Sequence, residues 1–161
     1  MMINKELICI DNDTHNWREA GNIVGNLLLK NQYVTETYLK KIIDYVEEFG
    51  PYIVFAPGIA LFHARPEDGV LKQGVALTVF KEGINFCAGV NDPVYLVFAL
   101  APESNNSHIE LLKDLSILLS DNSIKEQIIN SSDTDNIANI INSFDYKSWI
   151  IPCFTYVIIY S

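Results

Sequence analysis

The stretch Gly50–Val70, GPYIVFAPGIALFHARPEDGV, carries a long apolar run that ends abruptly at His63. A charged turn follows at once. The run is interrupted only by Pro57-Gly58, and this pattern predicts two short buried strands, at 52–56 and 59–61. A histidine at the carboxyl end of the second strand would be held rigidly and left accessible, in the crevice where α/β sheets usually bind ligands.

Helix and strand patterns alternate on either side of this stretch. Strands are expected at 6–11, 74–80 and 93–100, and helices at 14–30, 35–50, 107–119, 123–129 and 134–141. The first strand is short and is expected at an edge of the sheet. The strand at 93–100 is apolar on both faces, which is typical of a central strand covered on each side. This mixture predicts an α/β fold, a sheet with helices on both faces.

Polar residues and glycines mark the expected ends of the helices. Asp13 or Thr14 is the expected N-cap of the first helix. Gly50, followed by a proline, is the expected end of the second. Ser107 is the expected N-cap of the leucine-rich third helix.

Composition restricts the class of protein. The 161 residues are 49% hydrophobic and 19% charged, which favours one globular domain. A formal net charge of −9, without a basic patch interleaved with aromatic residues, argues against a nucleic-acid ligand. The chain has three cysteines, Cys9, Cys87 and Cys153, which are far apart. An odd number at such spacing argues against a disulfide framework and is typical of a protein in a reducing compartment. The chain shows no secretory signal and no apolar run of about 20 residues, so we expect a cytoplasmic protein.

The C-terminal extension, 145–161, differs from the rest of the chain. Its sequence DYKSWIIPCFTYVIIYS is rich in β-branched and aromatic residues from Trp149 to Tyr160. Exposed, these residues would form a large apolar patch. We therefore expect the extension to pack against its own domain or against a second subunit, which would make the protein a homo-oligomer.

His63 is the first candidate for chemistry. Its imidazole is a nucleophile and an acid–base group whose intrinsic pKa lies near neutrality. The alternative is a histidine that caps the strand end through ordinary hydrogen bonds, and the residues by themselves leave both interpretations open.

His108 is the second candidate. It precedes Leu111 and Leu112 by three and four positions, so it lies above the inward stripe of its helix. It also falls in the first turn, where free N–H groups and the helix dipole favour an anion. Considered alone, it is better explained as a histidine packed on the core. Together with His63, it suits a site through which a phosphoryl group passes.

Other polar residues have weaker claims. His15 has no evident companion and is expected at the surface. Arg65 could contact an anion bound at His63, although a single loop arginine is more often solvated. No metal-binding spacing such as HExxH is present, and no serine or cysteine has the sequence context of a nucleophile. A phosphate-binding GxxxxGK[ST] loop is also missing, so any phosphoryl donor must be something other than bound ATP.

Two segments together resemble a known family. The Gly50–Val70 stretch is similar to the active-site signature of mannitol/fructose-type IIA proteins of the bacterial phosphoenolpyruvate-dependent sugar phosphotransferase system, and its wording is closest to the ascorbate-type branch. The matching positions are Glu48, Phe55-Ala56, Ile59-Ala60-Leu61 and His63. The segment APESNNSHIELLKDLSILLSD resembles the second marker, a histidine that opens a leucine-rich helix. The segment QYVTETY, at 32–38, is also similar to a segment found in the family. The resemblance extends over about residues 5–144.

This resemblance implies a phosphotransferase IIA type-2 domain over 1–144, with a three-layer α/β/α sandwich and a mixed sheet. It implies that His63 accepts a phosphoryl group from the phosphocarrier protein HPr and passes it to a cysteine of a cognate IIB protein. His108 would be the auxiliary histidine. A membrane IIC permease would be an indirect partner, and no cofactor would be needed.

Two departures from the family pattern stand out. Phe62 occupies the position where relatives have proline before the active histidine. Glu47 and Glu48 stand where many relatives carry an arginine, which leaves Arg65 or a partner's arginine as the cation for the phosphoryl group. Two alternatives to a phosphocarrier remain open: a regulatory module whose phosphorylation state is read by a partner, and a degenerate member with a structural role.

Overall fold

A five-stranded sheet forms the middle of the molecule. The computed structural model describes residues 1–147, so the expected packing of the segment from Trp149 onward lies outside the described residues. The strands are β1 (Ile8–Asp11), β2 (Val54–Ala56), β3 (Ile59–Phe62), β4 (Gly74–Ile84) and β5 (Val94–Ala101). Their order across the sheet is β1-β4-β5-β3-β2. β1 therefore lies at an edge and β5 at the centre, as expected.

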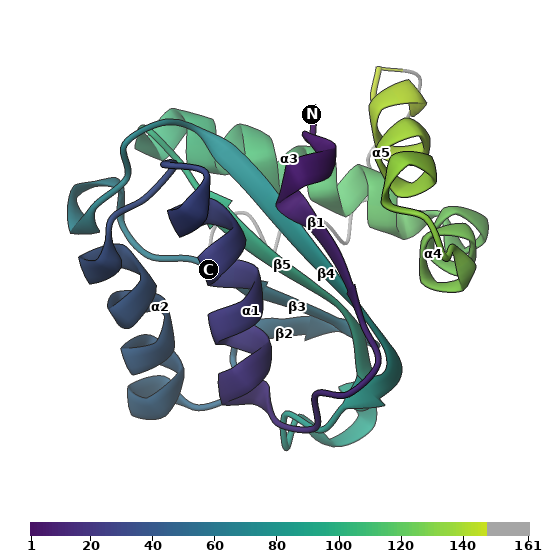
Figure 1. Ribbon diagram of the computed structural model, residues 1–161, viewed down its shortest axis with the longest axis horizontal. Coiled ribbons are helices and arrows are strands. Elements are labelled where there is room, and N and C mark those ends of the chain that lie inside the picture. Colours follow the sequence, from purple (N-terminus) through teal and green to yellow (C-terminus); the bar gives the residue numbers. More distant parts are fainter. Residues whose placement is uncertain (148–161) are drawn as a thin grey trace.

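Helices cover both faces of this sheet (Figure 1). They are α1 (Trp17–Lys30), α2 (Glu36–Phe49), α3 (Asn105–Ser120), α4 (Asn122–Asn130) and α5 (Thr134–Ser143). α1 and α2 cover one face, and α3, α4 and α5 lie on the other. The sheet is mixed, because β1 with β4 and β3 with β5 are parallel, whereas β4 with β5 and β2 with β3 are antiparallel. The three-layer α/β/α architecture is confirmed.

The parallel pair β3 and β5 brings two distant parts of the chain to one edge of the sheet. Its register aligns Phe62 with Ala99. Because the two strands run in the same direction, their carboxyl ends meet at one edge. The chain leaves β3 through His63 and leaves β5 toward α3, so both histidine-bearing segments begin at this edge.

The helix ends differ in part from expectation. α2 begins after Thr35 and ends at Gly50, which has a φ of 80°, as the pattern predicted. The prediction of Asp13 or Thr14 as the first N-cap was wrong, because Asn16 caps α1. The reason is local: the carboxylate of Asp11 accepts the N–H groups of both residues and turns the chain before the helix starts.

α3 starts earlier than its sequence pattern predicted. Ser104 is its N-cap, whereas Ser107, the predicted cap, lies three residues further along. The two serines form a capping box in which each side chain accepts the other's backbone N–H. β4 is also longer than expected, and it continues from Phe80 to Ile84.

Phe62 belongs to the core between the sheet and α1. Its side chain is fully buried, and its ring lies 6.2 Å from that of Phe86, centroid to centroid. A Cβ on Gly21 of α1 would lie 2.7 Å from Phe62 Cζ, so the glycine is what allows the helix to approach this closely. The ring at the family's proline position therefore has a structural role.

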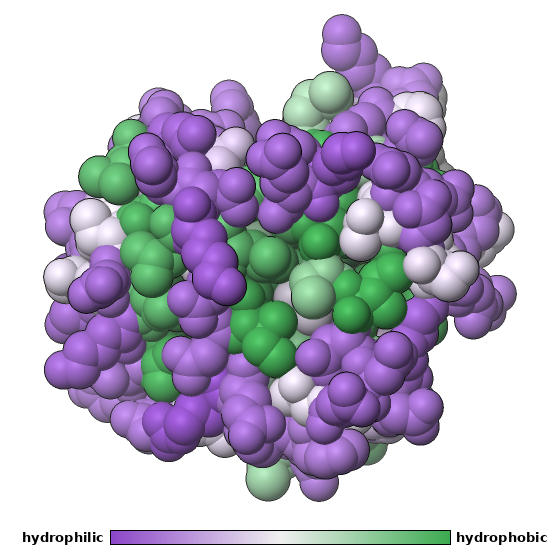
Figure 2. Space-filling model, in the orientation of Figure 1, coloured by the Kyte–Doolittle hydropathy of each residue, from purple (hydrophilic) through white to green (hydrophobic). Residues whose placement is uncertain are grey.

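On the face that carries α1 and α2, apolar surface is confined to patches between hydrophilic side chains (Figure 2).

Candidate active site

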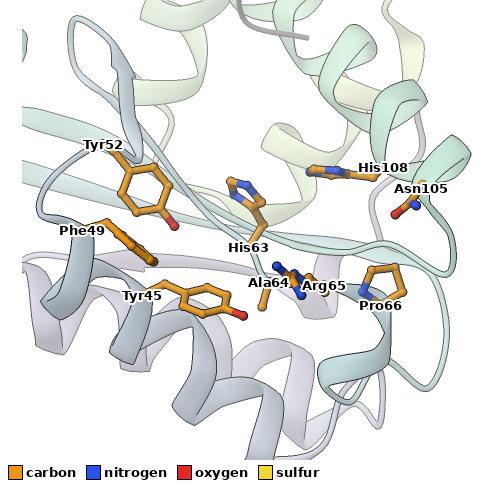
Figure 3. A pocket seen from close by; sticks show the side chains of 9 residues that line it. All are labelled: Tyr45, Phe49, Tyr52, His63, Ala64, Arg65, Pro66, Asn105 and His108. Carbon is orange, nitrogen blue, oxygen red and sulfur yellow. The ribbon is translucent and has the colours of Figure 1, made fainter. Parts of the chain in front are cut away.

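An open pocket lies at the carboxyl end of β3, between α2 and the start of α3. Its volume is about 540 Å³. It is lined by Tyr45, Phe49, Tyr52, His63, Ala64, Arg65, Pro66, Asn105 and His108. Figure 3 shows His63 between the aromatic side chains on one side and His108 with Asn105 on the other. All three predicted site residues, His63, His108 and Arg65, therefore line one pocket.

The ring of His63 is held in one tautomer by its own strand. The imidazole is half-buried, and its Nδ1 lies 3.2 Å from the carbonyl oxygen of Leu61. A carbonyl oxygen only accepts hydrogen bonds, so Nδ1 carries the proton and Nε2 carries the free lone pair. Burial lowers the pKa of His63 below its usual 6.5, although the hydrogen bond to Leu61 acts in the opposite direction. The neutral, nucleophilic form is thereby favoured.

His108 faces His63 across the pocket. The two ring centroids are 5.1 Å apart, and the ring planes are tilted by 37°. Burial, followed by the nearby charge of His63, lowers the pKa of His108. Its Nε2 is buried and has no hydrogen-bond partner in the described structure. A group bound at His63 would supply the partner that this nitrogen lacks.

The helix start near His108 differs from the expectation in one respect. The backbone N–H of His108 donates to Ser104 O at 2.9 Å, so it already belongs to the helix and is not free for an anion. The contribution of His108 to the site is therefore its imidazole. Asn105, the first residue of α3, also lines the pocket and was missed by the sequence analysis.

Arg65 lies in the turn that follows His63. Its side chain is exposed, and it is the only permanently charged side chain among the described residues that line the pocket. The backbone N–H of Arg65 donates to the carboxylate of Asp68 at 3.0 Å. The hydroxyl of Tyr45 donates to the same carboxylate oxygen at 3.1 Å, which ties the turn to α2. The acidic turn thus orders the loop and leaves the guanidinium unpaired with it.

Aromatic rings form the wall on the α2 side. Ring centroids are 6.1 Å apart for Tyr45 and Phe49, 6.1 Å for Phe49 and Tyr52, and 6.5 Å for Tyr52 and His63. Phe49 and Tyr52 are 62% and 46% exposed, so this wall faces solvent. The sequence analysis missed it, although Tyr45 and Phe49 have helical spacing just before the active-site stretch.

Other candidates lie away from this pocket. His15 is exposed and does not line it. Within residues 1–147, no group of three or more His, Cys, Asp or Glu side chains is placed to hold a metal ion. No helix in the same range is long and apolar enough to cross a membrane.

One protein family matches nearly the whole of the described chain. Residues 1–144 match the family described as phosphoenolpyruvate-dependent sugar phosphotransferase system, EIIA 2. The match therefore assigns the chain to a class of phosphotransfer components that work through a phosphohistidine. This chain belongs to the type-2 enzyme IIA family of that system.

Individual relatives support the assignment. The chain is 36% identical over 135 residues to the mannitol-specific cryptic phosphotransferase enzyme IIA component of Escherichia coli K12, covering 84% of this chain and 91% of that one. It is 40% identical over 99 residues to the ascorbate-specific EIIA component of the same strain, covering 62% and 64%. A solved complex of the mannitol enzyme IIA with phosphorylated enzyme IIB from Escherichia coli matches with a TM-score of 0.76 and 28% identity, covering 86% and 96%.

Proposed function

We propose that Nε2 of His63 accepts a phosphoryl group from phosphorylated HPr and passes it to a cysteine of a cognate IIB protein. The observation that carries this proposal is the orientation of the imidazole, which lines the pocket: its Nδ1 is bound to Leu61 O, and this leaves the lone pair on Nε2. A relative of this fold has been solved with its IIB partner, which supports the second half of the proposal.

The chemistry balances without a cofactor. The lone pair of His63 Nε2 attacks phosphorus, the phosphorus–nitrogen bond of the donor breaks, and its electron pair returns to the donor imidazole. The phosphorylated ring carries positive charge, and the hydrogen bond from Nδ1–H to Leu61 O stabilises it. In the second step a IIB thiolate attacks phosphorus, and the electron pair of the broken bond returns to Nε2.

Two groups of this chain are placed to stabilise the phosphoryl charge. His108 offers its buried Nε2 from across the pocket, and this nitrogen donates in the tautomer that carries the ring proton on Nε2. Arg65 supplies positive charge from the turn. Because its guanidinium is exposed, solvent weakens its effect, and a cation from the partner would complete the neutralisation.

The aromatic wall is suited to hold the partner proteins. A phosphoryl group can pass to His63 only while the donor covers the pocket, so the donor must contact the pocket rim. Phe49 and Tyr52 form the exposed part of that rim. Large exposed aromatic side chains next to a reactive group are typical of interaction surfaces.

We place this exchange in the cytoplasm and assign it to uptake of a sugar or a sugar acid of the ascorbate type, with a membrane IIC permease as indirect partner. Similarity to relatives specific for mannitol and for ascorbate supports this substrate class. The sugar itself would be recognised by the permease, since the pocket described above serves a partner protein.

Incubation with phosphoenolpyruvate, enzyme I and HPr, followed by mass measurement, tests the proposal. The intact chain should gain one phosphoryl group, and His63→Ala should gain none. The adduct should be labile in acid and stable in base, because a phosphoramidate nitrogen leaves once it is protonated. Addition of the cognate IIB protein should remove the adduct. A phosphorylated His63→Ala protein would overturn the assignment, and an adduct that no IIB removes would point to the regulatory alternative.

A further inference from the structure

Tyr38 of α2 has a hydroxyl group with partners on two separate chain segments. Its side chain is fully buried. The hydroxyl donates to the carbonyl oxygen of Leu100 at 2.5 Å and accepts the backbone N–H of Ala64 at 3.1 Å. One side-chain oxygen thus links α2, the end of β5 and the residue that directly follows His63.

The two linked segments are those that carry the imidazoles. Ala64 is the neighbour of His63, and the chain from Leu100 runs through the cap residue Ser104 into α3, which presents His108. A shift of either segment against the other would change the 5.1 Å separation of the two rings. The hydroxyl therefore sits where the geometry of the histidine pair is set.

The bond to Leu100 O depends on the neutral hydroxyl, whereas the bond from the Ala64 N–H needs only the hydroxyl oxygen. Burial raises the pKa of Tyr38 far above its usual 10, so the proton that binds Leu100 O stays in place. A phenylalanine would fill nearly the same volume but would leave the amide of Ala64, itself buried, without this acceptor. Tyr45 reaches the next residue only through the carboxylate of Asp68, and the bond from Thr35 N–H to Gly69 O at 2.9 Å holds a more distant part of the turn.

We propose that Tyr38 is a positioning residue for phosphoryl transfer, whose hydroxyl fixes the backbone at Ala64 and thereby the orientation of His63 toward His108. This inference rests on His63 being the phosphoryl acceptor. Since a misplacement of about 1 Å can cost roughly 10²-fold in rate, loss of the hydroxyl should slow transfer by about ten- to hundredfold. It should leave the affinity for HPr unchanged, because Tyr38 does not reach the surface.

The test compares Tyr38→Phe with Tyr146→Phe. The control loses a comparable bond, from the Tyr146 hydroxyl to Ile141 O at 3.0 Å, far along the chain from the pocket. Transfer kinetics should show a lower rate at saturating HPr with an unchanged KM for Tyr38→Phe, and the parent's values for the control. Nitrogen-15 spectra of the ring should show that His63 has lost its single tautomer in Tyr38→Phe only.

Each outcome decides a separate point. A folded Tyr38→Phe protein with the parent's rate and histidine spectrum would overturn the positioning role. If this variant does not fold, hydrogen exchange of the parent decides, because the Ala64 amide should be strongly protected and rapid exchange would refute the bond. A parent protein that takes up no phosphoryl group would instead refute the role of His63, and the tautomer of His63 in Tyr38→Phe would still test the positioning.

Discussion

The ring of Phe62 occupies the space beside Gly21 that a side chain on α1 would need. A Cβ on this glycine would lie 2.7 Å from Phe62 Cζ and 2.6 Å from Ile43 Cδ1. The position that carries proline in the family's signature therefore contributes here to the contact between β3 and the helical layer. The small residue on α1 leaves the room that this ring occupies.

Restoring proline at this position should destabilise the fold. Phe62→Pro removes a fully buried ring, and such losses cost about 3–5 kcal/mol when the cavity stays open. Urea unfolding measures the free energy. Gly21→Ala should be costly in the parent and cheaper by about 1 kcal/mol or more in the Phe62→Pro background, because the ring of Phe62 is gone and only the end of the Ile43 side chain still crowds the new methyl group. Strictly additive costs would contradict the packing described here.

Loss of the second imidazole should slow transfer without abolishing it. His108→Ala removes a group whose ring lies 5.1 Å from that of His63, but the proposed acceptor nitrogen of His63 remains. Removal of one donor at an oxyanion site costs about 10²–10³ in rate, and an open pocket should show less. Single-turnover phosphorylation measures the effect. His15→Ala, which changes an exposed histidine outside the pocket, should behave like the parent, and modification only at His108 would refute the division of roles.

His63, the proposed acceptor, should react below the pH at which an ordinary histidine becomes protonated. Burial lowers the pKa of His63 below 6.5 in the folded protein, so its rate of phosphorylation should stay on a plateau through pH 6.5 and fall only at lower pH. Because of the same shift in pKa, His63 binds a proton more tightly in the unfolded chain than in the folded protein. Stability should therefore be unaffected by this group above pH 6.5 and decrease below it. His63→Gln should lose part of that decrease, and the rest comes from His108, whose pKa is lowered as well. A rate midpoint above pH 6.5 would contradict this.

Arg65 should contribute through its charge. Arg65→Gln should lower the rate of phosphoryl transfer several-fold, and Arg65→Lys should recover part of the loss. Because the side chain is exposed, added salt should narrow the difference between parent and variant. Arg18→Gln is the matched control, since Arg18 is the only other arginine in the sequence and pairs with Glu47. An equal loss in both variants would indicate a general effect of net charge.

The aromatic wall should matter for partner affinity more than for chemistry. Phe49→Ala and Tyr52→Ala should raise the KM for HPr and weaken the complex with IIB, with little change in the rate at saturation. Titration calorimetry measures the affinity directly. Val90→Ala is the control, because Val90 is 94% exposed but does not line the pocket. A loss confined to the saturated rate would show that these rings act on the imidazole and not on the partner.

The sequence predicts the individual helices and strands well, but it predicts poorly which of them contact one another. The break at His63 and the leucine stripe after His108 identify both histidines, because each lies at the end of a regular pattern. Their contact depends on β3 lying next to β5, and no local pattern encodes the order of strands in a sheet. The N-cap of α3 illustrates the same limit, since Ser104 and Ser107 are both suitable N-cap residues. Only the hydrogen bonds of the capping box show that Ser104 is the cap and Ser107 its partner.

The residues that support the site were harder to find than the residues that react. Tyr38 sits among apolar residues on the buried face of α2, where a tyrosine is readily interpreted as core. Its hydroxyl has a function only because Ala64 and Leu100 approach it in space. Tyr45 and Phe49 were overlooked for the same reason, since their exposure at a pocket follows from the tertiary structure.

The parallel pairing of β3 with β5 also bears on when the protein becomes active. The two strands are separated in the chain by the whole of β4, so their pairing requires a long segment to close, and such non-local pairings form slowly in folding. Until this pairing forms, nothing holds the two imidazoles at the 5.1 Å separation found in the folded protein. Uptake of a phosphoryl group would therefore mark those molecules in which β3 has paired with β5. A nascent chain would take no phosphoryl group from the donor before this pairing forms.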